Sequence, residues 1–137
     1  MNTKRKPRQF GFTLIELMVV IAIIGVLATV VAVNLFAAGE EGNVAAVKQQ
    51  ISNFETALEQ YRIRNRQYPT TEQGLQALIA PQRFLNSSSV PNDPWGNPYV
   101  YRRPGPDGMA YEIISYGADG APGGTDYNAD ISSATMR

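Results

Sequence analysis

One stretch near the carboxyl end gathers oxygen-bearing side chains among glycines. Within residues 115–131, acidic side chains stand at Asp119, Asp126 and Asp130. Glycine lets the backbone turn so that carbonyls converge, and Ca²⁺ prefers many oxygen ligands in a flexible geometry. The segment from Asp126 to Asp130 is like the first half of an EF-hand loop, but it lacks the following glycine and the glutamate. Spacing alone therefore leaves two interpretations open, a calcium site that is not an EF-hand and an ordinary polar turn.

A further carboxylate, Glu16, lies inside the apolar stretch 12–38, four residues after Phe12. A charged side chain at the centre of a bilayer costs about 2.5–3.5 kcal/mol on insertion scales. Cleavage between Gly11 and Phe12 would create an α-amine one helical turn from Glu16. That amine could pair with the Glu16 of its own or of an adjacent subunit, and such pairs can set the register between stacked helices.

The composition excludes several kinds of chemistry. The chain has no cysteine and no histidine, so disulfides, cysteine nucleophiles, Cys/His zinc sites and a Ser-His-Asp triad are excluded. Lys plus Arg and Asp plus Glu are equal at 12 each, and no overall basic excess indicates nucleic acid as a partner. With 137 residues there is room for one domain and a long helix.

The apolar stretch 12–38 predicts a helix of roughly 40 Å, which is enough to cross a bilayer. Four basic residues precede it, and they place the N-terminus in the cytoplasm by the positive-inside rule: Lys4, Arg5, Lys6 and Arg8. A cleaved secretory signal peptide has a shorter apolar core, of about 7–15 residues. A plain single-pass anchor explains the length but does not explain Glu16.

Beyond the apolar stretch, hydrophobic residues recur at three- and four-residue steps: Val44, Val47, Ile51, Phe54, Leu58 and Tyr61. This pattern predicts an amphipathic helix with one apolar stripe. Because no proline occurs between Pro7 and Pro69, we expect one helix from Phe12 to about Asn65, loosened at Gly39 and Gly42. A helix that is apolar all round is stable in water only when it is surrounded. The first half is therefore expected to bury itself against copies of itself.

The remaining residues predict an α+β arrangement with a small antiparallel sheet packed on the stripe. We expect a short helix at 70–78, with Thr70 and Gln73 at capping-box spacing and Pro81 as its stop. A loop at 83–91 and a turn around Trp95 follow. Two strands, 99–102 and 111–116, should then form a hairpin through the turn at 104–108.

Two sets of motifs carry a family resemblance. The basic leader, followed by Gly11-Phe12-Thr13-Leu14-Ile15-Glu16 and an apolar helix, resembles the signal of type IV pilins and pseudopilins. The stretches YPTTEQGLQAL (68–78) and DPWGNPY (93–99) resemble, more narrowly, the major pseudopilins of type II secretion systems. Type IV pilins usually close a C-terminal loop with a disulfide, and this chain has no cysteine. A type IV pilus major pilin or another pilin-like filament subunit is the alternative.

The resemblance implies a pilin-like fold and a processed precursor. Residues 1–11 would be a leader removed after Gly11 by a prepilin peptidase, and Phe12 would then be N-methylated. Residues 12–38 would be the transmembrane and filament-core helix, with Glu16 acting in assembly. Residues 39–137 would be the periplasmic globular domain. Many relatives carry proline at the position of Val33, next to Asn34, so the resemblance does not extend to a kink there.

The resemblance also implies a structural role and a calcium site. The subunit would wait in inner-membrane lipid and polymerise with copies of itself and with minor pseudopilins. An assembly platform and a secretion ATPase would drive this step, and the filament would push folded proteins across the outer membrane. Asp119 and Asp130 would ligate Ca²⁺ with a main-chain carbonyl near Tyr116, and Thr125 or Asp126 would contribute. An anchored calcium-dependent enzyme is a further alternative, but the sequence shows no paired-carboxylate cleft, so we do not expect an enzyme.

Overall fold

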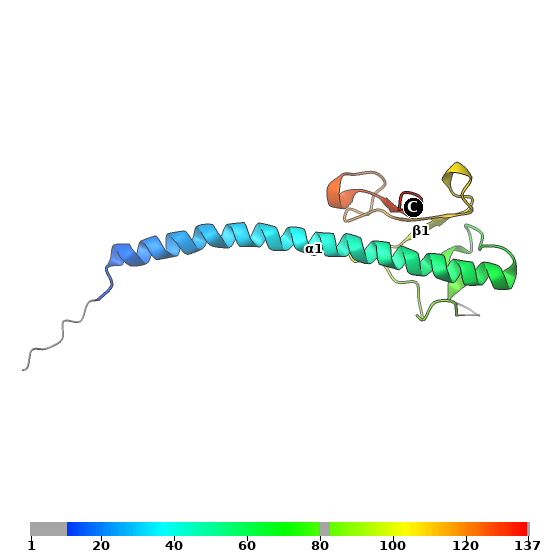
Figure 1. Ribbon diagram of the computed structural model, residues 1–137, viewed down its shortest axis with the longest axis horizontal. Coiled ribbons are helices and arrows are strands. Elements are labelled where there is room, and N and C mark those ends of the chain that lie inside the picture. Colours follow the sequence, from blue (N-terminus) through cyan, green and yellow to red (C-terminus); the bar gives the residue numbers. More distant parts are fainter. Residues whose placement is uncertain (1–10, 80–82, 137) are drawn as a thin grey trace, which may run out of the picture. The chain divides into compact units, whose positions relative to one another are not determined.

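The computed structural model describes residues 11–79 and 83–136, except for the side chains of residues 32–37 (Figure 1). The basic residues Lys4, Arg5, Lys6 and Arg8 and the expected helix stop Pro81 lie outside these ranges. The chain divides into two compact units, Met1–Ala38 and Gly39–Arg137.

Helix α1 spans Leu14–Asn65, close to the bounds expected from the sequence. Its backbone is helical through Val33, Gly39 and Gly42, and the loosening expected at the two glycines stays a prediction. The helix ends where Arg66 adopts a left-handed conformation with φ of 62°. Glycine usually takes this position because a side chain is disfavoured there. The Asn65 side-chain amide donates to the carbonyl of Tyr61 at 3.0 Å and satisfies one of the last helical acceptors.

In the first unit, the window Leu14–Val31 has a mean hydropathy of 2.8, and none of it is buried within the chain. Its length and composition are sufficient to cross a membrane. Thr13 immediately precedes the helix, and its hydroxyl accepts a hydrogen bond from the Glu16 amide at 3.3 Å, a common way to satisfy a free amide at a helix start. The window Leu14–Val31 therefore presents an uncovered, predominantly apolar surface, as the sequence predicts.

In the second unit, the apolar stripe of α1 forms the core. Val47, Ile51, Phe54 and Leu58 have no exposed surface. They pack with Leu75 and Leu78 and with buried side chains in or next to the first two strands of the sheet, namely Tyr99, Tyr101, Tyr111 and Ile113. The rings of Phe54 and Tyr99 meet edge to face, with centroids 5.1 Å apart, a favourable geometry for aromatic pairs. The middle of the predicted stripe, from Val47 to Leu58, is thus confirmed as core, whereas Val44 and Tyr61 at its two ends are half-buried.

The expected short helix at 70–78 is instead a turn followed by the 3₁₀ helix η1, Gly74–Leu78. The capping box does form: the Thr70 amide donates to Gln73 Oε1 at 2.9 Å, and the Gln73 amide donates to the Thr70 hydroxyl at 3.3 Å. Gly74 then adopts φ of +55°. This left-handed residue breaks the helical path between Thr70 and Leu75, so a continuous α-helix cannot form.

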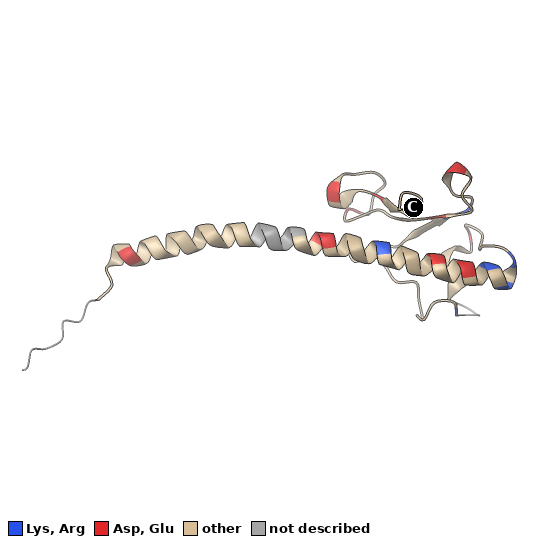
Figure 2. Cartoon of the chain, in the orientation of Figure 1, with Lys and Arg blue, Asp and Glu red and all other residues tan. Residues whose placement is uncertain are grey.

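The sheet has three antiparallel strands in the order β1-β2-β3. Strands β1, Val100–Arg102, and β2, Glu112–Ser115, lie within the two expected ranges. They are joined through η2, Pro106–Gly108. Strand β3, Ile131–Ser132, was not predicted, because two residues are too few to show an alternating pattern. Strand β3 pairs with the end of β2, with Ile131 opposite Ser115, and the acidic loop between them contains η3, Asp126–Asn128. In the cartoon of Figure 2, acidic positions are coloured red on η3 of this loop, and basic positions are coloured blue at the end of α1.

Candidate functional site

A buried carboxylate organises the turn that precedes β1. Asp93 is only 5% exposed. Its Oδ1 accepts hydrogen bonds from the amides of Trp95, at 3.2 Å, and Asn97, at 2.8 Å. Its Oδ2 accepts from the hydroxyl of Ser115, at 2.7 Å, and Ser115 is fully buried at the end of β2. Asp93 therefore fastens the turn to the strand from which the acidic loop departs.

Asn97 extends this connection into the acidic loop. Its side-chain amide donates to the carbonyl of Gly117 at 2.9 Å. Gly120 has φ of +65°, and a Cβ atom added there would lie 2.8 Å from Asn97 Oδ1, closer than real Cβ contacts come. Sequence reasoning predicted only a turn around Trp95 and missed the link of this turn to the loop. The available signal was the pair Asp93 and Asn97, because such side chains often bond to nearby backbone.

The loop brings the two predicted calcium ligands to the same short segment. Asp119 Oδ1 accepts from the amide of Ala121 at 3.1 Å, and Asp130 Oδ1 accepts from the amide of Gly123 at 3.0 Å. Both aspartates are exposed. Only Pro122 separates the two donors along the chain, so the carboxylates of Asp119 and Asp130 bind the same short backbone segment from opposite ends of the loop.

Two glycines let main-chain carbonyls of the loop come close. A Cβ atom on Gly117 would lie 2.7 Å from the carbonyl oxygen of Tyr127, and one on Gly124 would lie 2.3 Å from that of Asn128. Both glycines have positive φ, of +68° and +83°, which side chains rarely adopt. Ala118 donates its amide to the Tyr127 carbonyl at 2.9 Å. Only glycine at these positions permits this packing.

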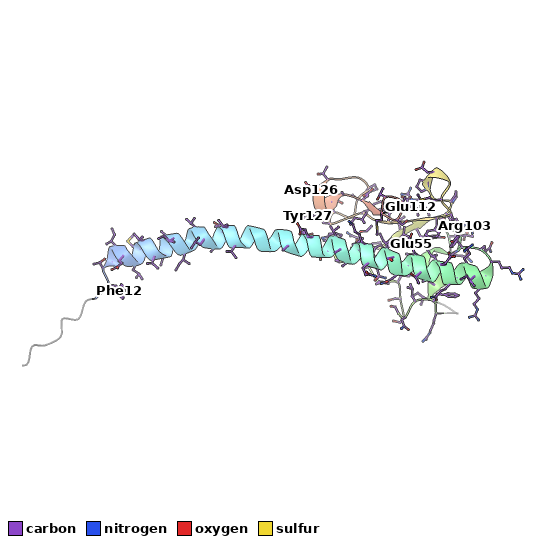
Figure 3. The ribbon with its side chains drawn as sticks, in the orientation of Figure 1. Phe12, Glu55, Arg103, Glu112, Asp126 and Tyr127 are labelled. Carbon is purple, nitrogen blue, oxygen red and sulfur yellow. The ribbon has the colours of Figure 1, made fainter. Side chains whose placement is uncertain are left out.

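The other three predicted ligand residues are placed differently. Tyr116 is half-buried between β2 and the loop, and Thr125 is exposed. Asp126 lines a groove beside Val44 of α1, together with Tyr127 (Figure 3). Among the residues that the structure describes, no three acidic side chains are grouped so as to hold a metal ion. Asp126 is thus not clustered with Asp119 and Asp130.

The donor set at this loop nevertheless fits a hard cation. Asp119 and Asp130 supply anionic oxygens, and the glycine-rich backbone between them supplies carbonyl oxygens. Calcium takes such ligands, whereas zinc prefers the cysteine and histidine side chains that this chain lacks.

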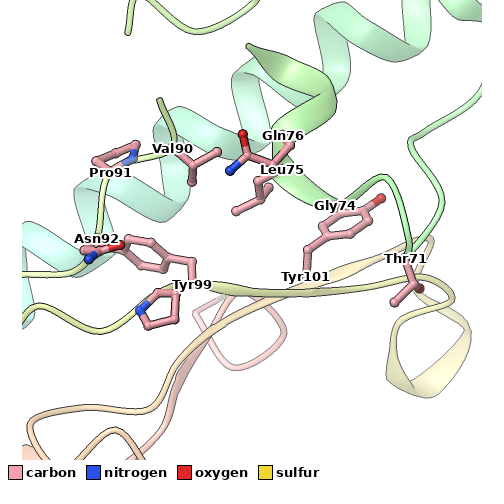
Figure 4. A pocket seen from close by; sticks show the side chains of 10 residues that line it. Thr71, Gly74, Leu75, Gln76, Val90, Pro91, Asn92, Tyr99 and Tyr101 are labelled. Carbon is pink, nitrogen blue, oxygen red and sulfur yellow. The ribbon is translucent and has the colours of Figure 1, made fainter. Parts of the chain in front are cut away.

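A separate cavity of about 310 Å³ lies between η1, residues 90–92 and β1 (Figure 4). Its titratable side chains are Tyr99 and Tyr101. Burial, together with the nearby charge of Asp93, raises the pKa of Tyr99 to about 12. Burial likewise raises the pKa of Tyr101 to about 12. The described lining contains no carboxylate or amine, so it offers no acid–base pair that titrates near neutral pH.

The predicted processing site is exposed. Gly11 and Phe12 lie in a non-helical segment just before α1, and Phe12 is 89% exposed (Figure 3). Glu16 is exposed one turn into the helix. Within the described chain, its carboxylate has no hydrogen-bond or ion-pair partner. The bond between Gly11 and Phe12 is therefore accessible, and Glu16 is available for pairing.

Comparison with known proteins identifies the family. The family model described as "Type II secretion system (T2SS), protein G" matches residues 34–134. The chain belongs to this family. A second model, described as "Prokaryotic N-terminal methylation motif", matches residues 6–32 of this protein G family member, the stretch that carries the predicted processing site.

Relatives and a solved structure agree with this assignment. The type II secretion system core protein G of Pseudomonas aeruginosa is 39% identical to this protein G family member, over 93% of this chain and 96% of the relative. The protein of the same name from Vibrio cholerae is also 39% identical, over 93% of each chain. The crystal structure of the major pseudopilin from the type 2 secretion system of enterohaemorrhagic Escherichia coli has a TM-score of 0.60 and 32% identity. The match covers 74% of this chain and 95% of the chain in that crystal structure.

These findings confirm the resemblance to type II secretion major pseudopilins and the expected fold, a long apolar N-terminal helix with a small antiparallel sheet. None of these matches favours the alternative of a type IV pilus major pilin. The family is a structural component of a secretion system rather than a known enzyme family.

Proposed function

We propose that this chain is the major structural subunit of a type II secretion pseudopilus. One observation carries the proposal: no part of the apolar window Leu14–Val31 is buried within the chain. Such a helix requires either lipid or other helices around it, since exposing its surface to water is unfavourable. Lipid of the inner membrane would surround it before assembly, and copies of the same helix would surround it in the filament.

The proposal includes the processing steps. A prepilin peptidase would cleave after Gly11, and the new terminus, Phe12, would be N-methylated. Its amine would lie one turn from Glu16, giving that carboxylate a partner in the apolar filament core. The segment before Phe12 would face the cytoplasm, and the unit from Gly39 onward would face the periplasm. The exposed Gly11–Phe12 bond and the unpartnered Glu16 support this order of events.

The proposed partners follow from the same role. Minor pseudopilins would join the homopolymer, and an inner-membrane assembly platform, powered indirectly by a secretion ATPase, would extract the subunits from lipid. The growing periplasmic filament would drive folded proteins across the outer membrane. The chain itself would have no enzymatic activity. The absence of an acid–base pair among the described residues that line the cavity beside Tyr99 supports this part of the proposal.

Two variants test the main proposal in cells that carry the secretion machinery. Gly11→Leu should block cleavage and leave a heavier precursor band, because a bulky residue would occupy the position before the cut. Glu16→Ala should be cleaved normally yet assemble no filament. Glu72→Ala, an exposed carboxylate in the globular unit, is the matched control and should behave as wild type. Normal secretion by both test variants would refute the proposed function.

We also propose that the acidic loop binds Ca²⁺. Asp119 and Asp130 would provide the side-chain ligands and the backbone near Tyr116 a carbonyl, with Thr125 and Asp126 as further candidates. The bound ion would join the two ends of the loop by attraction to both carboxylates. In a chain without disulfides, this would stabilise the C-terminal segment.

Calorimetric titration of the full chain in detergent tests the calcium proposal. The wild type should bind Ca²⁺, and both Asp119→Asn and Asp130→Asn should weaken binding by at least about tenfold, since each removes one anionic ligand. Asp107→Asn, an exposed position in η2, is the control. The variant Asp126→Asn should also bind Ca²⁺ more weakly if the Asp126 side chain is a ligand, and as tightly as the wild type if it is not. If the wild type shows no heat of Ca²⁺ binding, the proposed calcium site is wrong.

A further inference from the structure

An apolar groove with an acidic rim lies in the second unit. Its lining consists of Glu41 and Val44 of α1 and of Asp126 and Tyr127 of η3, and its volume is about 500 Å³. We call these four residues the acidic groove. Val44 and Tyr127 are half-buried, whereas Glu41 and Asp126 are exposed. Figure 3 shows Asp126 and Tyr127 on η3 beside the helix. In the described part of the chain, neither carboxylate has a side-chain hydrogen bond or ion pair.

The C-terminal end of α1 has the complementary character. Ile63 is 73% exposed. It is the only large hydrophobic side chain after Val31 that is exposed, among those that the structure describes. Three arginines surround it in the sequence, and we call the four residues the basic end: Arg62, Ile63, Arg64 and Arg66. Arg62 pairs with Glu59, but Arg64 and Arg66 have no side-chain partner within the described residues.

We propose that the basic end of one copy docks in the acidic groove of a second copy, with Ile63 against Val44 and Tyr127. This inference rests on the proposed function, because it assigns a contact between globular units of the same homopolymer. The apolar centre and opposite rim charges match the usual composition of a protein interface, in which charge complementarity fixes orientation and register. A groove rimmed by two unpaired carboxylates favours an occupant that carries unpaired guanidinium groups.

The contact cannot form within one subunit. Val44 and Ile63 belong to the same helix, 19 residues apart, which corresponds to about 28 Å along its axis. A contact between two different surfaces is heterologous, and repeated without closure it generates an open filament. The offset between the two surfaces also sets the stagger. Contacting copies whose helices run parallel should be displaced by about 28 Å along the helix direction.

Cysteine cross-linking tests this inference directly, because the chain has no cysteine of its own. In the full-length double variant Val44→Cys with Ile63→Cys, a disulfide requires Cα atoms about 4.4–6.8 Å apart. A link within one subunit is therefore impossible at this helical separation. Mild oxidation of assembled filaments should give a ladder of trimers and higher species. Each single variant has one thiol and can give no more than a dimer. Val44→Cys with Ser88→Cys, an exposed loop position, is the control pair and should give no ladder.

Charge reversal provides a second measurement. Glu41→Arg and Arg64→Glu should each lower the yield of filaments at least about threefold, and the double variant should restore it, as expected for rim charges that fix orientation. Glu72→Arg is the matched control and should leave the yield unchanged. If filaments form but neither a ladder nor a charge effect appears, this inference is overturned while the proposed function stands. Cross-links of the groove thiol to another protein alone would overturn it too. If the wild type forms no filament, both fail.

Discussion

Asp93 is the residue whose removal should most disturb the link between the turn and the acidic loop. It is 5% exposed, and its carboxylate accepts three hydrogen bonds, from the amides of Trp95 and Asn97 and from the hydroxyl of Ser115. The variant Asp93→Ala removes all three acceptors at once. It leaves a buried serine hydroxyl and two backbone amides without their partner.

The expected loss in the free energy of unfolding for Asp93→Ala can be worked out from these three hydrogen bonds. A hydrogen bond to a charged group contributes about 1.5–3 kcal/mol, and the donors left behind carry a desolvation cost. Trp95 and Asn97 are only half-buried, so water can reach their amides and replace part of the loss. We therefore expect the free energy of unfolding to fall by about 3–5 kcal/mol, which corresponds to a melting temperature lower by roughly 12 °C or more. Asp93→Asn keeps the shape but loses the charge and replaces one acceptor oxygen with an NH₂ donor. Its remaining oxygen can still accept from the amides of Trp95 and Asn97, so a loss of about 1–2 kcal/mol is expected.

Thermal unfolding of the full chain in detergent, followed by the fluorescence of Trp95, measures this effect. Trp95 is the only tryptophan, and its indole N–H donates to Glu40 at 2.8 Å, so its emission reports on the turn itself. Glu72 is an exposed carboxylate, so Glu72→Ala is the reference for the loss of an acidic side chain that is not buried. If Asp93→Ala melts within a few degrees of Glu72→Ala, the proposed organising role of this carboxylate is wrong.

Three further changes have expected outcomes. Gly124→Ala should destabilise the second unit by about 1–3 kcal/mol in chemical denaturation, since its Cβ would meet the Asn128 carbonyl, whereas Gly123→Ala has free space and should show only the strain of its positive φ. Phe54→Ala should cost about 3–5 kcal/mol by the same measurement, because that side chain is fully buried. Tyr99 has a pKa of about 12 when folded against 10.0 ordinarily; the unfolded chain loses its proton first, so stability should be unchanged below pH 10 and fall between pH 10 and 12, as checked by denaturation at each pH.

The sequence was most informative about α1. Its two halves differ in pattern, since apolar residues surround the helix at 12–38 and form one stripe from Val47 to Leu58, and no proline interrupts either. Periodicity of this length is a strong signal, because many residues contribute to it. Strands β1 and β2 were also predictable from their aromatic and β-branched residues. Fold class and the core face of the helix followed from these elements together.

The parts that sequence reasoning missed depend on contacts between distant residues. Strand β3 has two residues, and only its pairing with β2 reveals it. The break at Gly74 is a backbone conformation that the capping pair Thr70 and Gln73 did not disclose, because that pair is compatible with a turn as well as with a helix. In the sequence, Asp93 is indistinguishable from an ordinary turn residue, because its partner Ser115 lies 22 positions later in the chain. Local patterns carry no information about such pairings.

The separation of the apolar surface between the two units has a consequence for assembly. The stripe from Val47 to Leu58 has no exposed surface, because the second unit buries it fully. Polymerisation therefore does not need to open the globular core in order to obtain apolar contacts. Among described side chains, the large exposed hydrophobic surface lies at residues 12–31 and at Ile63. Assembly can then proceed with a folded globular unit, since the surfaces that require partners are those that folding leaves uncovered.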